Sequence, residues 1–381
     1  MTGNSIPAQV TYISLGNIPS RWAHTVQMMK MSEALAQEVG QFELVTQVHW
    51  RNCWKRRFDF ESWYGILHPF RIKTLITRCA HRDAVATQVF SIPFAEAAVR
   101  YVEKQRPDLV ITRCHHAAEK LAAGSIPFIY ETHSRDDEQL DSWLIPIAGS
   151  PMLRGVVTIA ESLVPRYCER GISEDKIAVL EDAVDFDRWQ QVPSQNVARR
   201  QLGLPGDAFI AVYCGHLYEH RGIEDIMDAA AVRSDVEFVL VGGRPEDVEK
   251  RKEEAAHLPN VSFTGFVPNT QVPLYAAASD CILIPYSADL PQADIMSPLK
   301  LFESMATSRP IIASDLPAIR KHLNKENALL VAPDSGEAIA AALSALHSGS
   351  IDGRKLALAA LDAVRPHTWR VRAQQMLKLA H

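Results

Sequence analysis

The 381-residue sequence lacks several features that would each indicate a class of protein. Its six cysteines form no CxxC pair, so neither a zinc ribbon nor a disulfide framework is indicated. No apolar run approaches the roughly 20 residues of a membrane span. The N-terminus lacks the charged start and apolar core of a signal peptide. The net charge of -5 argues against a nucleic-acid partner bound through bulk positive charge. We therefore expect a cytoplasmic protein, soluble or held peripherally at the inner face of the membrane.

The sequence also lacks a GxGxxG fingerprint after a strand, which argues against a dehydrogenase. Instead, strand-like apolar runs alternate with helical stretches, first in one set and then in a second set that begins near Pro205. The first set is VTYISLG, FELVTQV, PDLVITRC, PFIYETH and GVVTIA. The second set is FIAVYCG, VEFVLVGG, VSFTGFV, DCILIPY and PIIASD. Two such sets predict an α/β protein with two doubly wound domains and a cleft between them.

The most informative segment is SPLKLFESMATSRPIIASDLP, at 297–317. Ser297 suits a helix N-cap and Pro298 the first helical position, so the segment predicts a helix followed by a buried strand. A helix start carries unpaired backbone N–H groups and partial positive charge, which suit a diphosphate. Glu303, further along the helix, can accept hydrogen bonds from sugar hydroxyls. The alternative is a capped helix and a strand of the kind that any α/β protein contains.

The wording PLKLFESMATSRPIIASDLPAI resembles the donor-binding segment of the retaining family 4 glycosyltransferases. That family has the GT-B fold, in which two Rossmann-like doubly wound domains face each other across a cleft. It usually carries two glutamates eight positions apart here, and the second contacts the nucleotide ribose. Glu303 matches the second glutamate. The first falls on Ile295, beside Asp294, so this sequence departs from the pattern at the position of a sugar contact.

The resemblance covers nearly the whole chain and is most specific over 209–317. It implies an acceptor-side domain at 1–190 and a nucleotide-sugar-binding domain at 191–364. It also implies a last helix, 365–381, that packs back on the first domain. Asp185 matches a turn that closes the first domain, which is a structural role.

Donor contacts are implied mainly in the second half of the chain. The GRLxxxKG segment of the family places its two basic residues at His216 and Arg221, near the diphosphate. An arginine can hold a diphosphate with paired hydrogen bonds, and Lys300 is expected beside it. Phe266 and Val267 are expected against the base, with core packing as the alternative for Phe266. The full set of implied donor-binding residues is Gly16, Asn17, His216, Arg221, Gly242, Phe266, Val267, Ser297, Pro298, Leu299, Lys300 and Glu303.

His133 is the implied catalytic residue. It follows the strand-like run PFIYE, and the carboxyl edge of a parallel sheet is where such folds bind ligands. Its expected work is hydrogen bonding and electrostatic support of the transferring sugar, without covalent chemistry. His115 and His116 also follow a strand end and are rivals for this role.

The resemblance therefore implies a retaining glycosyltransferase that uses a nucleoside-diphosphate sugar, with UDP and GDP donors both open. The expected partners are that donor and a carbohydrate or lipid-linked acceptor, with no nucleic acid, metal or cofactor. The basic, aromatic segment 50–58 is expected to contact lipid phosphate or an anionic membrane, with a solvated loop as the alternative. Two other functions stay open: a nucleotide-sugar epimerase of GT-B architecture and a non-catalytic nucleotide-binding protein.

Overall fold

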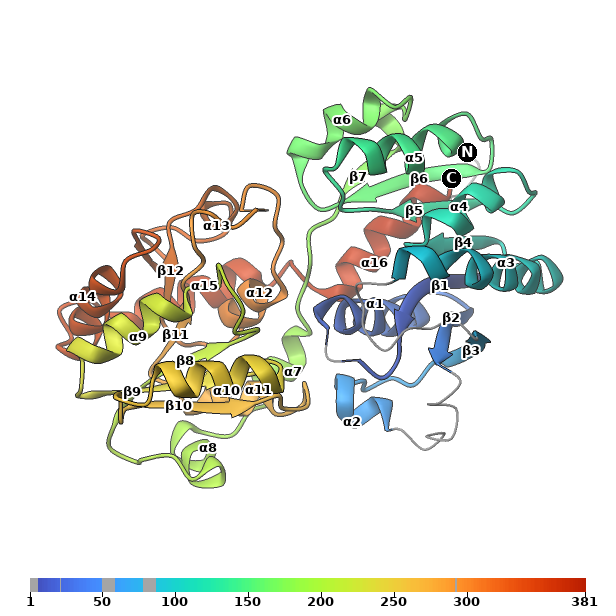
Figure 1. The fold of residues 1–381 in the computed structure, drawn as a ribbon. Helices are drawn as coiled ribbons and strands as arrows, with labels where there is room; N and C mark the ends of the chain where they lie inside the picture. Colours follow the sequence, from blue (N-terminus) through green and yellow to red (C-terminus); the bar gives the residue numbers. More distant parts are fainter. Residues whose placement is uncertain (1–5, 21, 50–58, 78–86, 292) are drawn as a thin grey trace. The chain divides into compact units, whose positions relative to one another are not determined.

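The computed structural model describes residues 6–20, 22–49, 59–77, 87–291 and 293–381 (Figure 1). The chain forms two compact units, the first being Met1–Asp182 with Trp369–His381 and the second Ala183–Thr368. Each unit is built on one parallel sheet with helices on its faces, which confirms the doubly wound α/β fold predicted from the two sets of strand-like runs. The segment 50–58 and the side chain of Asn17 lie outside the described residues.

The first unit has a seven-stranded sheet in the order β3-β2-β1-β4-β5-β6-β7. Its strands are β1 (Gln9–Asn17), β2 (Gln41–His49), β3 (Arg71–Thr77), β4 (Leu109–Thr112), β5 (Phe128–Glu131), β6 (Leu153–Thr158) and β7 (Ile177–Val179). Its helices are α1 (Ala23–Glu38), α2 (Phe60–Tyr64), α3 (Thr87–Gln105), α4 (His115–Ala122), α5 (Asp137–Ala148), α6 (Val164–Cys168) and α16 (Trp369–Leu377). Strands β4 and β5 are buried along their whole length, as expected for strands that are covered on both faces.

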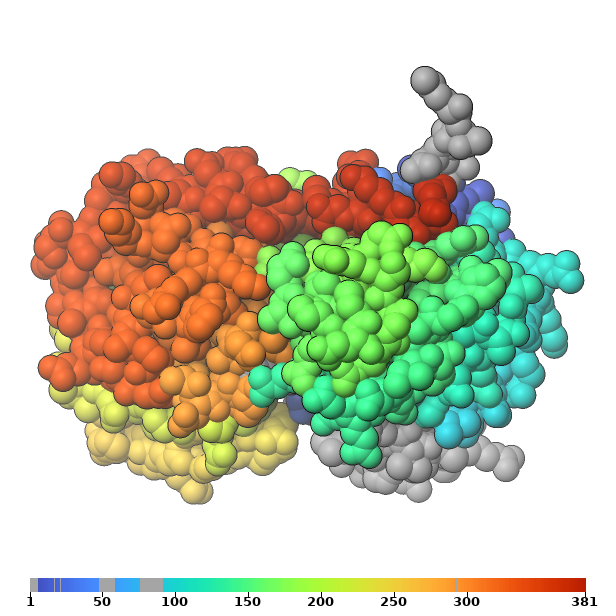
Figure 2. Space-filling model, turned by 90° about the horizontal axis from the view of Figure 1, so that it is seen from above, coloured from blue at the N-terminus to red at the C-terminus, as the bar shows by residue number. Residues whose placement is uncertain are grey.

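The C-terminal helix α16 packs on α1 (Figure 1). Arg370 of α16 forms an ion pair with Glu38 of α1, with 2.6 Å between Nε and Oε1. Gln374 donates a hydrogen bond to the other oxygen of Glu38, at 2.9 Å. In the space-filling view, the red C-terminal residues lie on the surface of the first unit (Figure 2). The end of the chain is thus part of the first unit and supplies residues to its interior.

The second unit has a six-stranded sheet in the order β10-β9-β8-β11-β12-β13. Its strands are β8 (Phe209–Cys214), β9 (Val236–Val241), β10 (Val261–Gly265), β11 (Cys281–Ile284), β12 (Ile311–Ser314) and β13 (Leu329–Val331). Its helices are α7 (Phe186–Gln190), α8 (Gln195–Leu202), α9 (Ile223–Val232), α10 (Pro245–Glu254), α11 (Val272–Ala278), α12 (Leu299–Met305), α13 (Pro317–Arg320), α14 (Gly336–His347) and α15 (Gly353–Val364).

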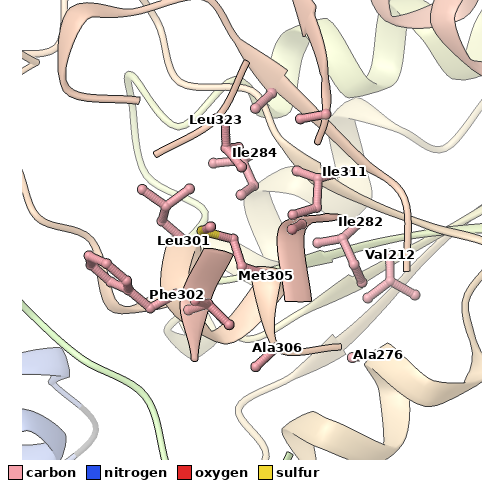
Figure 3. Packing of buried hydrophobic residues seen from close by; sticks show 14 of the residues in the cluster. Val212, Ala276, Ile282, Ile284, Leu301, Phe302, Met305, Ala306, Ile311 and Leu323 are labelled. Carbon is pink, nitrogen blue, oxygen red and sulfur yellow. The ribbon is translucent and has the colours of Figure 1, made fainter. Parts of the chain in front are cut away.

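Helix α12 packs its apolar side against this sheet (Figure 3). Leu301, Phe302 and Met305 are buried together with Ile282 of β11 and Ile311 of β12. Burial of each large apolar side chain stabilises the unit by about 1.5–3 kcal/mol. This packing fixes the rotation of the short helix and therefore the direction in which its polar residues point.

Both sheets reverse their strand order at one place. In the first unit the reversal lies between β1 and β4, and in the second between β8 and β11. Open α/β sheets bind ligands outside the carboxyl ends of the strands at such a reversal, because the connections leave in opposite directions and open a crevice there. The polar residues at these two edges are therefore the candidates for function.

None of the helices in the described part of the chain has the length and apolar character needed to span a bilayer.

Gly222, the N-cap of α9, lies where a side chain cannot be accommodated. Its φ is +68°, and a Cβ there would lie 1.5 Å from the carbonyl oxygen of Pro285. We expect Gly222→Ala to lower the free energy of unfolding by more than about 3 kcal/mol, because the backbone must move and the left-handed conformation is strained. Urea unfolding of the variant measures this loss.

Gly203→Ala is the matched control for this prediction. Gly203 has almost the same φ, +67°, but a Cβ there would meet no atom within 4 Å. Only the backbone penalty then remains, about 1–2 kcal/mol. Equal losses for the two variants would show that the contact with Pro285 does not constrain the turn before α9.

Candidate functional site

Two positively charged side chains lie together at the β8–β11 edge of the second unit. Lys300 of α12 places Nζ 4.2 Å from the centre of the Tyr213 ring and 4.3 Å from that of Tyr286. The guanidinium carbon of Arg221, just before α9, lies 4.7 Å from the Tyr218 ring centre and 5.3 Å from that of Tyr286. Both cations therefore face the Tyr286 ring, and three tyrosines hold them by cation–π contacts.

The hydrogen bonds of these two cations lead only to neutral groups. Arg221 Nη2 donates to the Tyr218 hydroxyl at 2.6 Å, and Lys300 Nζ donates to the Tyr213 hydroxyl at 3.2 Å. Arg221 Nε is buried and has no hydrogen-bond partner. Within the described ranges, neither cation has a carboxylate within 4.0 Å. Two positive charges without a counter-charge favour the binding of an anion at this edge.

The electrostatics of Lys300 support this interpretation. Burial lowers the pKa of Lys300 well below its usual range, and the charge of Arg221 acts in the same direction. An anion in contact with both side chains would reverse that shift, since it favours the charged form. The positive charge of Lys300 is thus unfavourable in these buried surroundings, and an anion that binds there would compensate for it.

His216 belongs to the same cluster but does not add a charge. Its ring lies 5.2 Å from the Tyr218 ring, and its carbonyl oxygen accepts a hydrogen bond from the Tyr213 hydroxyl at 2.6 Å. Burial, together with the charges of Arg221 and Lys300, lowers the pKa of His216 to about 4. Burial and the two neighbouring cations therefore disfavour a charge on His216, which leaves Arg221 and Lys300 as the side chains of the cluster that suit an anion.

Helix α12 starts one residue later than the sequence indicated. The prediction that Ser297 is the N-cap and Pro298 the first helical residue is wrong, because Pro298 has extended dihedrals (φ -79°, ψ 126°) and is itself the N-cap. Ser297 is buried just before it, and Leu299 is the first helical residue. The non-helical ψ of Pro298 shifts the whole helix start by one position.

Glu303 lies on α12 one turn after Lys300 and is half-buried. Its carboxylate lies near Cys214, the last residue of β8. Burial raises the pKa of Cys214 to about 12, and the negative charge of Glu303 adds to this increase. Lys300 lowers the same pKa, so both side chains of α12 are near Cys214. The helix thus brings a cation and a carboxylate to the carboxyl end of β8.

The remaining predicted donor residues of this unit have mainly structural surroundings. Gly242 has φ +114°, and a Cβ there would lie 2.3 Å from the carbonyl oxygen of Gly215, so the ends of β8 and β9 meet closely. Val267 packs against the apolar core, and Phe266 is half-buried. Ile295, at the place of the first glutamate, is only 4% exposed. The contacts of Gly242, Phe266 and Val267 with a donor stay predictions.

In the first unit, His133 lies in a network of charged side chains at the ends of β4 and β5. Its Nε2 is 3.1 Å from Glu131 Oε1, and its Nδ1 is 3.3 Å from Arg113 Nη2. Arg372, from α16, donates to the same Glu131 oxygen at 2.7 Å. Glu131 is 1% exposed and the His133 side chain 20%. The structure thus ties the predicted catalytic residue to three charged groups.

Gln27 of α1 extends this network. Its amide nitrogen donates to Asp182 at 2.7 Å and to Glu131 at 3.4 Å, while its oxygen accepts from Arg113. Burial raises the pKa of Asp182 to about 7, and the charge of Glu131 adds to this, although Arg372 and Arg113 oppose it. Two arginines and two carboxyl groups therefore share one polar cluster.

The rival histidines lie in different surroundings. The ring of His115 stacks on Trp143 of α5, with 4.7 Å between ring centres and 16° between planes. Burial, then the neighbouring His116, lowers the pKa of His115 to about 4. His116 pairs with Glu119 at 3.8 Å.

Gly16 is buried at the end of β1, and its carbonyl oxygen accepts a hydrogen bond from Thr46.

The sequence reasoning missed Arg113, Glu131 and Arg372. A signal existed for the first two, since Arg113 follows the apolar strand LVIT and Glu131 ends the apolar strand FIYE. No local signal identifies Arg372, which comes from the far end of the chain. The three tyrosines around Arg221 and Lys300 were not predicted from the sequence either.

Residues 208–348 match the family described as glycosyl transferases group 1. This range contains the β8–β11 edge, and with it the cluster of Arg221, Lys300 and Glu303. The match therefore falls on the unit in which the sequence resemblance was most specific.

Similar proteins include several glycosyltransferases. A putative teichuronic acid biosynthesis glycosyltransferase, TuaC of Bacillus subtilis, is 30% identical over 170 residues, 44% of this chain and 40% of that protein. The alpha-galactosylglucosyldiacylglycerol synthase of Streptococcus pneumoniae is 28% identical over 170 residues, 42% and 44% of the two chains. A Mycobacterium leprae phosphatidyl-myo-inositol mannosyltransferase is 26% identical over 208 residues, 53% and 54% of the chains. The match thus spans about half the length of these relatives.

Solved structures are similar over almost the whole chain. Anabaena Alr3699/HepE in complex with UDP and glucose has a TM-score of 0.73 at 15% identity, covering 97% of this chain and 98% of that one. Sucrose-phosphate synthase from Thermosynechococcus elongatus has a TM-score of 0.74 at 20% identity, with the same coverage. Together with the two parallel sheets, these similarities show the two-domain GT-B α/β fold.

Proposed function

We propose that this chain is a retaining glycosyltransferase that moves a sugar from a nucleoside-diphosphate sugar to an acceptor hydroxyl, in polysaccharide or glycolipid biosynthesis. The pair of Arg221 and Lys300, with no carboxylate partner among the described residues, is the observation that carries the proposal. The family match over 208–348 and the UDP-bound HepE structures support it.

The cation pair suits a leaving diphosphate. A guanidinium offers paired hydrogen bonds to phosphate oxygens, and an ammonium offers a compact charge. Each hydrogen bond to a charged group contributes about 1.5–3 kcal/mol. Because aromatic rings hold both cations, a diphosphate does not have to displace a carboxylate before it binds. These two charges also give us reason to expect turnover without added metal.

Glu303 is the proposed ribose contact. It is a half-buried carboxylate near the end of β8, on the same short helix as Lys300. Two adjacent ribose hydroxyls can donate to one carboxylate, so the helix would hold the diphosphate and the ribose at a fixed separation. The donor base, uracil or guanine, stays open.

The proposed reaction is a front-face displacement. The bond between the anomeric carbon and the diphosphate oxygen breaks, and the acceptor hydroxyl enters from the same face. A diphosphate oxygen takes the proton of that hydroxyl. Arg221 and Lys300 stabilise the charge on the leaving group, and His133 supports the transferring sugar, so the protein acts by orientation and electrostatics.

The proposed acceptor is a carbohydrate or a lipid-linked hydroxyl compound. The relatives are named for teichuronic acid biosynthesis, a galactosylglucosyldiacylglycerol and phosphatidyl-myo-inositol, that is, for a glycan, a glycolipid and a phospholipid. Contact of 50–58 with an anionic membrane stays a prediction. An epimerase would instead convert the sugar nucleotide with no acceptor present, so acceptor-dependent product formation separates the two functions.

Glu303→Ala tests the donor site. We expect it to weaken nucleoside-diphosphate binding at least about tenfold, because each hydrogen bond to a charged acceptor contributes about 1.5–3 kcal/mol net. Calorimetric titration measures the change. Glu303→Gln, which keeps one acceptor oxygen, should fall between the wild type and the alanine variant. Unchanged affinity in Glu303→Ala would rule out the ribose contact.

A further inference from the structure

His133 has a protein group at each ring nitrogen, and one of these groups fixes where the ring hydrogen lies. An arginine side chain only donates hydrogen bonds. Arg113 Nη2, at 3.3 Å from Nδ1, therefore requires Nδ1 to accept, and the ring hydrogen must lie on Nε2. That hydrogen points to Glu131 Oε1 at 3.1 Å, which is an acceptor. The two contacts are consistent with one tautomer only.

We propose that Arg113 is a positioning residue that holds His133 in its neutral form, with the ring hydrogen on Nε2. The inference deepens the proposed function and rests on it only for the effect on turnover. In this arrangement His133 supports the sugar through a fixed ring dipole and does not transfer protons, because both nitrogens are bound to the protein.

Arg113 is itself held through its other terminal nitrogen. Its Nη1 donates to the Gln27 oxygen, and the Gln27 nitrogen in turn donates to Asp182 at 2.7 Å. Tyr12 of β1 is close enough to Arg113 for the guanidinium charge to oppose, weakly, the rise of the pKa of Tyr12 that burial causes. The guanidinium therefore cannot turn away from His133 without breaking its bond to Gln27 of α1.

The charges around the ring disfavour a second proton. A protonated Nδ1 would direct its N–H at the Arg113 guanidinium, so two donors would face each other. Glu131 favours the charged ring, but its Oε1 also accepts from Arg372 at 2.7 Å, which offsets its charge. Burial, followed by the charge of Arg113, lowers the pKa of His133 to about 4, in agreement with this geometry.

Nitrogen NMR of protein labelled with ¹⁵N-histidine tests the inference directly. The His133 signals are assigned by their absence from a His133→Asn variant. Between pH 6 and pH 8 we expect an unprotonated Nδ1 and a protonated Nε2. In Arg113→Met, which has no donors and no charge, the pKa of His133 should rise by at least about one unit, tenfold in proton affinity. Arg113→Lys, which keeps a charged donor, should stay close to the wild type.

His115 provides the reference within the same spectra. Its pKa is lowered by burial and by His116, with no contribution from Arg113, so its signals should not change in Arg113→Met. Wild-type His133 that is doubly protonated, or that carries its hydrogen on Nδ1, at pH 7 would overturn the inference. So would a pKa of His133, titrated from pH 3 to pH 8, that is the same in Arg113→Met as in the wild type. The wild-type spectrum tests the tautomer of His133 even if the Arg113→Met variant does not fold.

Turnover gives the second readout. Arg113→Met should lower kcat about as much as His133→Ala and leave KM for the donor nearly unchanged, and the double variant should lose no more than either single one. Additive losses would show that Arg113 acts independently of His133 and would overturn the positioning role. Absence of turnover in the wild type, with the expected spectrum intact, would refute the proposed function and leave the tautomer assignment in place.

Discussion

Replacement of Arg221 by alanine is expected to weaken nucleoside-diphosphate binding by about 10- to 100-fold, the equivalent of one lost hydrogen bond to a charged group. The affinity for the corresponding nucleoside should change much less, because the guanidinium acts on the phosphates. Arg221 has no carboxylate partner in the described ranges, so its charge is available to a ligand. Calorimetric titration of the wild type and the variant with both ligands measures the two changes.

Arg244→Ala is the matched control for Arg221→Ala. Arg244 is also an arginine that precedes a helix in this unit, but it pairs with Asp247 at 2.7 Å and its side chain is 43% exposed. Its charge is already compensated, so its removal should leave nucleotide affinity within about twofold of the wild type. An equal loss of nucleoside and diphosphate affinity in Arg221→Ala would contradict the diphosphate role.

Replacement of His133 by alanine is expected to lower kcat by about 10²- to 10³-fold, the range seen when one preorganised polar group is lost at a reacting centre. Nucleotide affinity should stay nearly unchanged, because the proposed diphosphate and ribose contacts lie in the second unit. The loss also leaves Glu131 and Arg113 each without one partner. Steady-state kinetics with donor and acceptor, combined with calorimetry, separate the two quantities.

The other histidines of the first unit control for this result. His115→Ala and His116→Ala remove rings that contact Trp143 and Glu119, and neither ring is hydrogen-bonded to Glu131 or Arg113. Both should keep most of the wild-type turnover. Full turnover in His133→Ala would assign the catalytic role elsewhere, and a large loss in His115→Ala alone would assign it to that rival. Thermal unfolding of each variant separates these effects from a loss of fold.

The interior strands and the edge strand β10 could be predicted from the sequence, whereas strands β3, β7 and β13 could not. Each of these three lies at a sheet edge. β3 reads RIKTLIT, with charged and apolar residues mixed, and β7 and β13 have three residues each. A strand with one neighbour needs less continuous apolar sequence than a strand covered on both sides, so the signal that identified β4 and β5 is absent from it.

The site could be predicted only where one short segment carries it. Lys300 and Glu303 lie on the same helix, and their spacing can be read directly from SPLKLFE. The aromatic surroundings of the cations join Tyr213, Tyr218 and Tyr286 from different elements, and Arg372 reaches Glu131 from 241 residues away. Contacts of that kind depend on tertiary packing. The position of the α12 start depended on the ψ of a single proline, which the sequence pattern does not determine.

The central claim is that the second unit binds a nucleoside diphosphate through Arg221, Lys300 and Glu303. Calorimetric titration of the purified protein with UDP, GDP, ADP, CMP and NAD, without added metal, tests it most directly. We expect selective binding of one nucleoside diphosphate, which would also identify the donor class. Binding of NAD alone, or of none of the five, would contradict it.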